Sequence, residues 1–284
     1  MIRPETSPSP SPPRHGVRAI WRSRTAGVGF ILTSLVSLVA LFDRRIAPGN
    51  PFTTSPSARL ARPSRAHLMG TDQLGRDVFT GVVQGAHTSF RVVIGVVVIS
   101  GVIGLLVGTV AGLRGGLLDD VVMRLVEIVQ TVPRFFLSVL AIAWFGPGGR
   151  TLTILLGLTS WPLIARVLRA EALSLREQGF VGAARSMGAS DLRILLHHII
   201  PNVLPTACVF LALTGSRVVL LEAGLAFLGL GDPNVASWGS LINNAQPYLE
   251  VAWWMWVFPG AAIVTAVLGM NLLADGLTGA LAHE

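Results

Sequence analysis

Long uncharged stretches divide the chain at intervals. Three of them contain 18, 22 and 24 residues, at positions 25–42, 92–113 and 251–274. A hydrocarbon core about 30 Å thick requires roughly 20 apolar residues of helix to cross it. We therefore predict that each of these three stretches forms a membrane-spanning helix.

A fourth stretch, residues 194–216, is uncharged but contains two prolines near its start, Pro201 and Pro205. Proline removes a backbone donor and interrupts a helix interior. We expect the spanning part to begin near Val203 and to continue toward Glu222.

Two shorter uncharged stretches, residues 135–149 and 151–165, flank a glycine-rich turn at 146–149. This pattern predicts a helical hairpin whose first arm extends back through residues 121–132 and whose second arm extends to Leu168. The total is six spans, so we predict an all-α polytopic membrane protein with six transmembrane helices.

The arginines predict the orientation of the chain. Six spans place both termini on one side, and residues 1–24, 114–134 and 166–193 on that side carry 13 arginines. Cytoplasmic loops are enriched in basic residues, so we expect both termini in the cytoplasm. The predicted parts are a disordered cytoplasmic tail at 1–24, rich in serine and proline, a first transmembrane helix at 25–42, an extracytoplasmic segment at 43–88, and a core domain at 89–284 that contains five helices and a cytoplasmic loop at 169–200.

Composition excludes several chemistries. The chain is 51% hydrophobic and 13% charged, and all 22 basic residues are arginine. A Walker A phosphate loop requires a lysine, so this chain has no such loop. Cys208 is the only cysteine, which excludes an intrachain disulfide and a cysteine-based zinc site. We expect no cofactor, no metal and no catalytic residue on this chain, and no nucleic-acid partner.

One cytoplasmic stretch has helical character but is too polar to span. Ala183 and Ala184 precede Met187 by four and three residues, spacings from which we predict that the three share one helix face. Gly188 precedes a turn, after which Ser190 or Asp191 could cap a second helix. Two interpretations stay open: a docking helix for another protein, or an amphipathic helix lying under the membrane.

Residues 182–190 read GAARSMGAS, and Pro201 follows. This string resembles the E-A-A motif of the permease subunits of bacterial ABC importers, which forms the helix that docks into the partner ATPase. The strings GTDQLGRD at 70–77, EAGLAFLGLG at 222–231 and SWG at 237–239 extend the resemblance to the dipeptide, oligopeptide and nickel family, in particular its second, C-type permease subunit. The resemblance covers residues 68–280.

The resemblance implies the fold of a type I ABC importer permease and a set of ATPase-coupling residues: Gly182, Ala183, Ala184, Met187, Gly188, Ala189, Asp191 and Pro201. Two positions depart from the family pattern. Gly182 stands where the motif has its glutamate, so the ion pair of that glutamate is not implied here. Gly279 replaces the second acid of the closing N-L-L-G-D-x-L-x-D string.

The resemblance also implies partners and place. The partners are a second permease subunit that completes the translocation path, two ABC ATPase subunits that hold ATP and Mg²⁺, an extracytoplasmic substrate-binding protein, and lipid of the bacterial inner membrane. The solute would be a peptide or a related small solute such as nickel, a nickel chelate or an opine. Asp72, Arg76 and Asp77 would lie in an outer segment near the mouth of the path, unless they only stabilise their loop.

Parts of the sequence also fit other functions. Arg217 and Glu222 are the ionisable residues near the middle of a predicted span, which marks either a pathway or an interface. They are five residues apart, a poor distance for pairing on a helix. An ATP-independent secondary transporter or channel would use such an acid. The string GLGD at 229–232 resembles that of membrane aspartyl proteases, but the second aspartate of those enzymes is missing.

Overall fold

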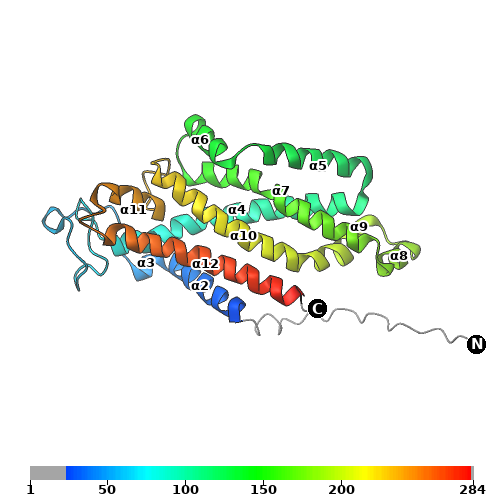
Figure 1. Ribbon diagram of the computed structural model, residues 1–284, viewed down its shortest axis with the longest axis horizontal. Helices are drawn as coiled ribbons and strands as arrows, with labels where there is room; N and C mark the ends of the chain where they lie inside the picture. Colours follow the sequence, from blue (N-terminus) through cyan, green and yellow to red (C-terminus); the bar gives the residue numbers. More distant parts are fainter. Residues whose placement is uncertain (1–23, 283–284) are drawn as a thin grey trace, which may run out of the picture.

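The computed structural model describes residues 24–282. Five long helices run along one bundle (Figure 1): α2 (Arg24–Leu41), α4 (Val78–Arg114), α7 (Gly149–Arg176), α10 (Ile200–Phe227) and α12 (Trp254–Ala282). The shorter helical elements are α3 (Asp43–Ile46), η1 (Pro56–Ala58), α5 (Gly116–Thr131), α6 (Arg134–Phe145), α8 (Gly179–Ser186), α9 (Asp191–Ile194), η2 (Leu195–Ile199), α11 (Trp238–Ala245) and η3 (Gln246–Tyr248). The bundle has two distinct ends, which we call the α8 end and the α11 end.

The long helices have the length and composition of membrane spans. By these criteria α2, α4, α7, α12 and the continuous helix Asp191–Phe227 each qualify. At least half of each apolar window is not buried inside the chain. This apolar surface is suited to contact with lipid or with another membrane subunit.

The first arm of the predicted hairpin is not one straight helix. It consists of α5 and α6, which are bent by 77° at the break between them. Pro133 lies at this break, and Val132 before it adopts an extended backbone. A residue before proline is disfavoured in the helical region, so the arm bends there, and the two pieces qualify as a span only when taken together.

The prolines of α10 do not interrupt the spanning helix. Pro201 lies at the start of α10 after the π-helical turn η2, and Pro205 lies inside the helix. Both prolines lie inside the continuous helix Asp191–Phe227, and the π-helical turn directly before Pro201 is a local change in the hydrogen-bond pattern of that helix. The helix therefore does not begin near Val203 as we predicted, whereas it does run past Glu222, as expected.

The second span begins earlier than its uncharged stretch indicated. The side chain of Asp77 caps α4 by accepting a hydrogen bond from the Thr80 N–H at 2.8 Å. The first turns of α4 carry polar residues but pack closely, since Gly85 lies against Trp238 of α11. Residues 78–88, expected in the segment before the core, are therefore the beginning of α4.

Glycines bring α4 and α7 into close contact. A Cβ added at Gly108 would lie 2.5 Å from the Ala165 carbonyl oxygen, and one at Gly104 would lie 2.7 Å from the Ile164 Cβ. Without a hydrophobic force between helices in lipid, such small-residue contacts stabilise helix association. This pair connects the two ends of the bundle.

Candidate functional site

A short helix projects at the α8 end of the bundle (Figure 1). Val181 and Ala184 of α8 are buried, and they pack in one apolar cluster with Leu168 and Ala172 of α7 and with Ile194 of α9. The inner face of α8 is thus attached to two of the long spanning segments. A displacement of α8 would therefore disturb the packing of both segments.

The outer face of α8 is apolar and open. Phe180 is 41% exposed and Met187 is 82% exposed, and Gly182 and Ala183 are exposed beside them. Large apolar side chains at such exposure on a small helix are typical of an interaction surface. We call Phe180, Ala183 and Met187 the α8 stripe.

The structure corrects the expected composition of this face. Ala183 and Ala184 were predicted to share it, but Ala184 is only 4% exposed and points into the protein. Consecutive helical residues point about 100° apart, so the two alanines cannot face the same surface. Ala183 accompanies Met187, whereas Ala184 accompanies Val181.

The turn after α8 requires glycine. Gly188 has φ +81°, and a Cβ there would meet nothing within 4 Å. The Gly188 N–H donates to the Arg185 carbonyl at 2.9 Å, and the Ala189 N–H donates to the Ala184 carbonyl at 3.0 Å. The backbone conformation, and not lack of space, therefore explains the glycine.

The remaining expected coupling residues lie further along the chain. Ser190, and not Asp191, caps α9, because its side chain accepts a hydrogen bond from the Arg193 N–H at 3.4 Å. The Asp191 carboxylate is exposed and lies 4.0 Å from the Arg185 guanidinium. Pro201 lies at the start of α10, outside the α8 stripe.

Arg217 and Glu222 occupy opposite environments on α10. Glu222 is 4% exposed and accepts a hydrogen bond from the Ser89 hydroxyl of α4 at 3.0 Å. Arg217 is exposed on the surface of the bundle. Within residues 24–282 the two form no ion pair, so Glu222 belongs to the interior and Arg217 to the outer face.

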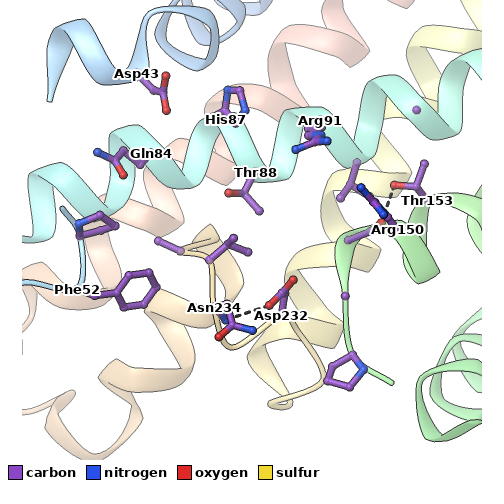
Figure 2. Close-up of a pocket in the computed structure, with 18 of the residues that line it drawn as sticks. Asp43, Phe52, Gln84, His87, Thr88, Arg91, Arg150, Thr153, Asp232 and Asn234 are labelled. Carbon is purple, nitrogen blue, oxygen red and sulfur yellow. Dashed lines mark hydrogen bonds between the residues drawn. The ribbon is translucent and has the colours of Figure 1, made fainter. Parts of the chain in front are cut away.

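A cavity of about 1300 Å³ lies at the α11 end (Figure 2). It is bounded by α3 and the segment after it, by α4, by the start of α7 and by the loop after α10. Its charged lining consists of Asp43, Arg44, Arg91, Arg150 and Asp232. These residues are distributed over much of the chain, so the sequence did not indicate that they meet; its one signal was that Asp43, Arg91 and Arg150 each border an uncharged stretch.

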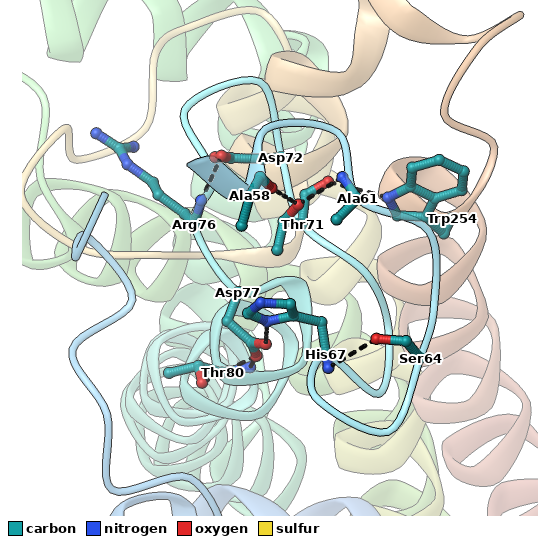
Figure 3. A network of polar contacts seen from close by, with 10 residues as sticks. All are labelled: Ala58, Ala61, Ser64, His67, Thr71, Asp72, Arg76, Asp77, Thr80 and Trp254. Carbon is teal, nitrogen blue, oxygen red and sulfur yellow. Dashed lines mark hydrogen bonds and ion pairs between the residues drawn. The ribbon is translucent and has the colours of Figure 1, made fainter. Parts of the chain in front are cut away.

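Asp72, Arg76 and Asp77 lie in a network of polar contacts at the same end (Figure 3). The Asp72 carboxylate accepts the Leu74 and Arg76 N–H groups, each at 2.8 Å. Asp77 caps α4 and lies 3.0 Å from the His67 ring nitrogen. Both carboxylates thus stabilise the backbone of the loop.

The Arg76 side chain has a different role. Its guanidinium carbon lies 5.4 Å from the centre of the Phe52 ring, a distance suited to a cation–π contact. No ion pair joins Arg76 to Asp72 or Asp77 in the described part of the chain. The three residues stabilise their loop by backbone hydrogen bonds and ring contact, not by pairing with each other.

Comparison with known proteins places this architecture in a class. Residues 104–284 match the family model described as the inner membrane component of binding-protein-dependent transport systems. The match covers more than half of the chain, and the chain therefore belongs to this family. It is the permease component of a binding-protein-dependent ABC transporter.

Relatives cover nearly the whole chain. A putative peptide transport system permease protein of Brucella suis is 38% identical over 265 residues, which is 93% of this chain and 89% of the relative. The dipeptide transport system permease protein DppC of Alkalihalophilus pseudofirmus is 34% identical over 272 residues, which is 95% of this chain and 90% of the relative.

A solved structure supports the fold. The inward-facing MetNI methionine ABC transporter contains a chain that matches with a TM-score of 0.56 and 21% identity, over 72% of this chain and 96% of that chain. At this identity the likeness concerns the fold. It confirms the all-α, type I ABC permease fold expected from the sequence.

Proposed function

We propose that this chain is the C-type permease subunit of an ATP-driven importer of peptides, and that it forms the translocation path together with a second permease subunit. The names of its relatives, which specify peptides and dipeptides, support the choice of solute. A substrate-binding protein would deliver the peptide at the α11 end. The α8 end would face the cytoplasm, with both termini on that side.

The α8 stripe is the observation that carries the proposal. Helix α8 presents this exposed apolar surface on one side, while its buried face packs onto α7 and α9. In the proposed cycle two ATPase subunits bind ATP and Mg²⁺, close, and displace one such helix in each permease. A rigid contact of this kind converts a small displacement at one end into rearrangement of packed helices.

The other proposed coupling residues support this contact in different ways. Gly182 and Ala183 leave room for close approach, and Met187 supplies an adaptable apolar side chain. Gly188 forms the turn, while Ala184 fastens α8 to the bundle. Ala189, Asp191 and Pro201 join the turn to α10.

The substitution Gly188→Trp tests the coupling site. We expect it to reduce the ATPase that co-purifies with the solubilised transporter at least tenfold and to abolish ATP-driven uptake of tri-alanine into vesicles. The matched control is Gly229→Trp, because Gly229 also has φ +81° and open space but lies after α10, away from α8. The control substitution should cause the same backbone strain, but the transporter should still co-purify with its ATPase.

Two results would contradict the proposal. One is co-purification of ATPase with Gly188→Trp at the level of the control. The other is accumulation of tri-alanine by vesicles that contain this chain alone without nucleotide, which would instead support an ATP-independent transporter.

A further inference from the structure

We propose that the cavity at the α11 end is a peptide-binding subsite in which Arg91 and Arg150 receive the carboxylate of a peptide and Asp232 receives its ammonium group. This inference rests on the proposed function and adds a site on the permease itself. The permease would then make specific contacts with the peptide after the binding protein has released it. Figure 2 shows the residues that line the cavity.

The unpaired charges of the cavity support this assignment. Its lining contains three arginines and two aspartates, yet none of these five residues belongs to an ion pair in residues 24–282. The ion pairs of that part of the chain all lie elsewhere. Charges of both signs that converge on one cavity without neutralising each other are suited to a solute that itself carries both signs.

The elements that supply the charges are rigidly placed. Arg91 comes from α4 and Arg150 from the first turn of α7, and these two helices pack against each other along their length. The Asp232 carboxylate reaches the glycine turn before α7, where its Oδ2 lies 3.9 Å from the position of a Cβ on Gly148. Asp43 begins α3 and lines the cavity from another wall.

The remaining lining is suited to peptide groups. Thr88 and Asn234 supply hydrogen-bond donors and acceptors, and Phe52 supplies an apolar wall. Gln84 supplies only its amide oxygen, because its amide nitrogen already donates to the Ala47 and Gly49 carbonyls. Clefts that bind small ligands typically enclose about 300–1,000 Å³. A cavity of about 1300 Å³ therefore accommodates a short peptide together with water.

Protection of an introduced cysteine tests the site. Thr88 is half-buried in the cavity wall, so Thr88→Cys would report occupancy. The substitution is made in a Cys208→Ser background, because Cys208 is the natural cysteine and is exposed. In the complete transporter without binding protein, we expect tri-alanine to slow maleimide labelling at position 88 at least threefold. Labelling of Ser57→Cys, exposed and outside the cavity lining, should not change.

Blocked peptides identify which charges act. In the Thr88→Cys background tri-alanine amide and N-acetyl-tri-alanine should each protect about tenfold more weakly than tri-alanine. Arg150→Gln should weaken protection by tri-alanine but not further weaken protection by the amide. Asp232→Asn should weaken protection by tri-alanine but not further weaken protection by the N-acetyl peptide.

Three outcomes would overturn the inference. Labelling that is unaffected by tri-alanine excludes the subsite, and equal protection by all three peptides excludes the assignment of charges. Protection given only by the binding protein, with or without peptide, would make the cavity a protein docking surface. ATP-driven uptake of tri-alanine by the transporter with an unaltered position 88 tests the proposed function separately, since uptake without protection removes the subsite and leaves the function.

Discussion

Glu222 is a buried acid in an apolar bundle, and its surroundings explain how it is tolerated. Ionisable groups at membrane depth are costly unless they have partners. Ser89 of α4 donates a hydrogen bond to Glu222 at 3.0 Å and is itself fully buried. Gly239 of α11 packs closely on the neighbouring Ala223, with 2.3 Å between its added Cβ and the Ala223 carbonyl oxygen. Glu222 therefore lies where α4, α10 and α11 meet, which favours a positioning role.

The substitution Glu222→Gln separates positioning from proton transfer. Glutamine keeps a carbonyl oxygen that accepts from Ser89, so we expect a melting temperature in detergent close to wild type and retained ATP-driven uptake. Glu222→Leu leaves the Ser89 hydroxyl without this acceptor and should cost about 1–3 kcal/mol. Loss of uptake in Glu222→Gln at an unchanged melting temperature would show that the acidic proton is required.

Helix α2 is attached to α12 through glycine. A Cβ on Gly29 would lie 2.2 Å from the Leu273 backbone nitrogen, and one on Gly276 would lie 2.3 Å from the Ala26 Cβ. In the same interface, a Cβ on Gly269 would lie 2.9 Å from the Thr33 backbone nitrogen. Such close approach of two backbones is a source of helix association in lipid. The first described helix is thereby held against the last.

The substitution Gly29→Ala should separate these helices. Because the added methyl group meets backbone atoms, α2 must move, and we expect a loss of about 1–3 kcal/mol, measured as a lower melting temperature of the solubilised protein. Gly27→Ala is the matched control, since a Cβ there meets nothing within 4 Å. Equal melting temperatures for the two variants would contradict the close packing of α2 on α12.

On the scale of the whole molecule, the two ends are distinct sites joined by long helices. The α8 stripe lies at one end, and the charged cavity and the polar network of residues 43–77 lie at the other (Figure 1). Trp254, only 2% exposed at the start of α12, donates its indole N–H to the Thr71 carbonyl at 3.0 Å. This bond fastens the segment 43–77 to the bundle.

The substitution Trp254→Phe should loosen that segment. It retains an aromatic ring but leaves the Thr71 carbonyl without its donor, at a cost of about 1 kcal/mol. We expect trypsin to cleave after the exposed Arg59 roughly fivefold faster, which corresponds to that free energy. Trp253→Phe is the control, because Trp253 is 49% exposed. Similar cleavage rates in the two variants would contradict the anchoring role of Trp254, and ATPase co-purification should be unaffected in both.

The sequence by itself determined the features that depend on local rules. Bilayer thickness sets the length of a spanning helix, so the uncharged stretches at 25–42, 92–113 and 251–274 located α2, α4 and α12. The turn at Gly188 was predictable because glycine readily adopts a positive φ. The family resemblance of residues 182–190 was readable from the same segment.

Only the tertiary structure decided which side chains face outward and which distant residues meet. Spacing could not assign Ala184 to the inner face, because that depends on packing against α7 and α9. Spacing also could not show that the polar first turns of α4 pack against α11. The cavity combines residues from four separated parts of the chain. Such arrangements depend on contacts between segments far apart in sequence, which a local pattern of residues does not specify.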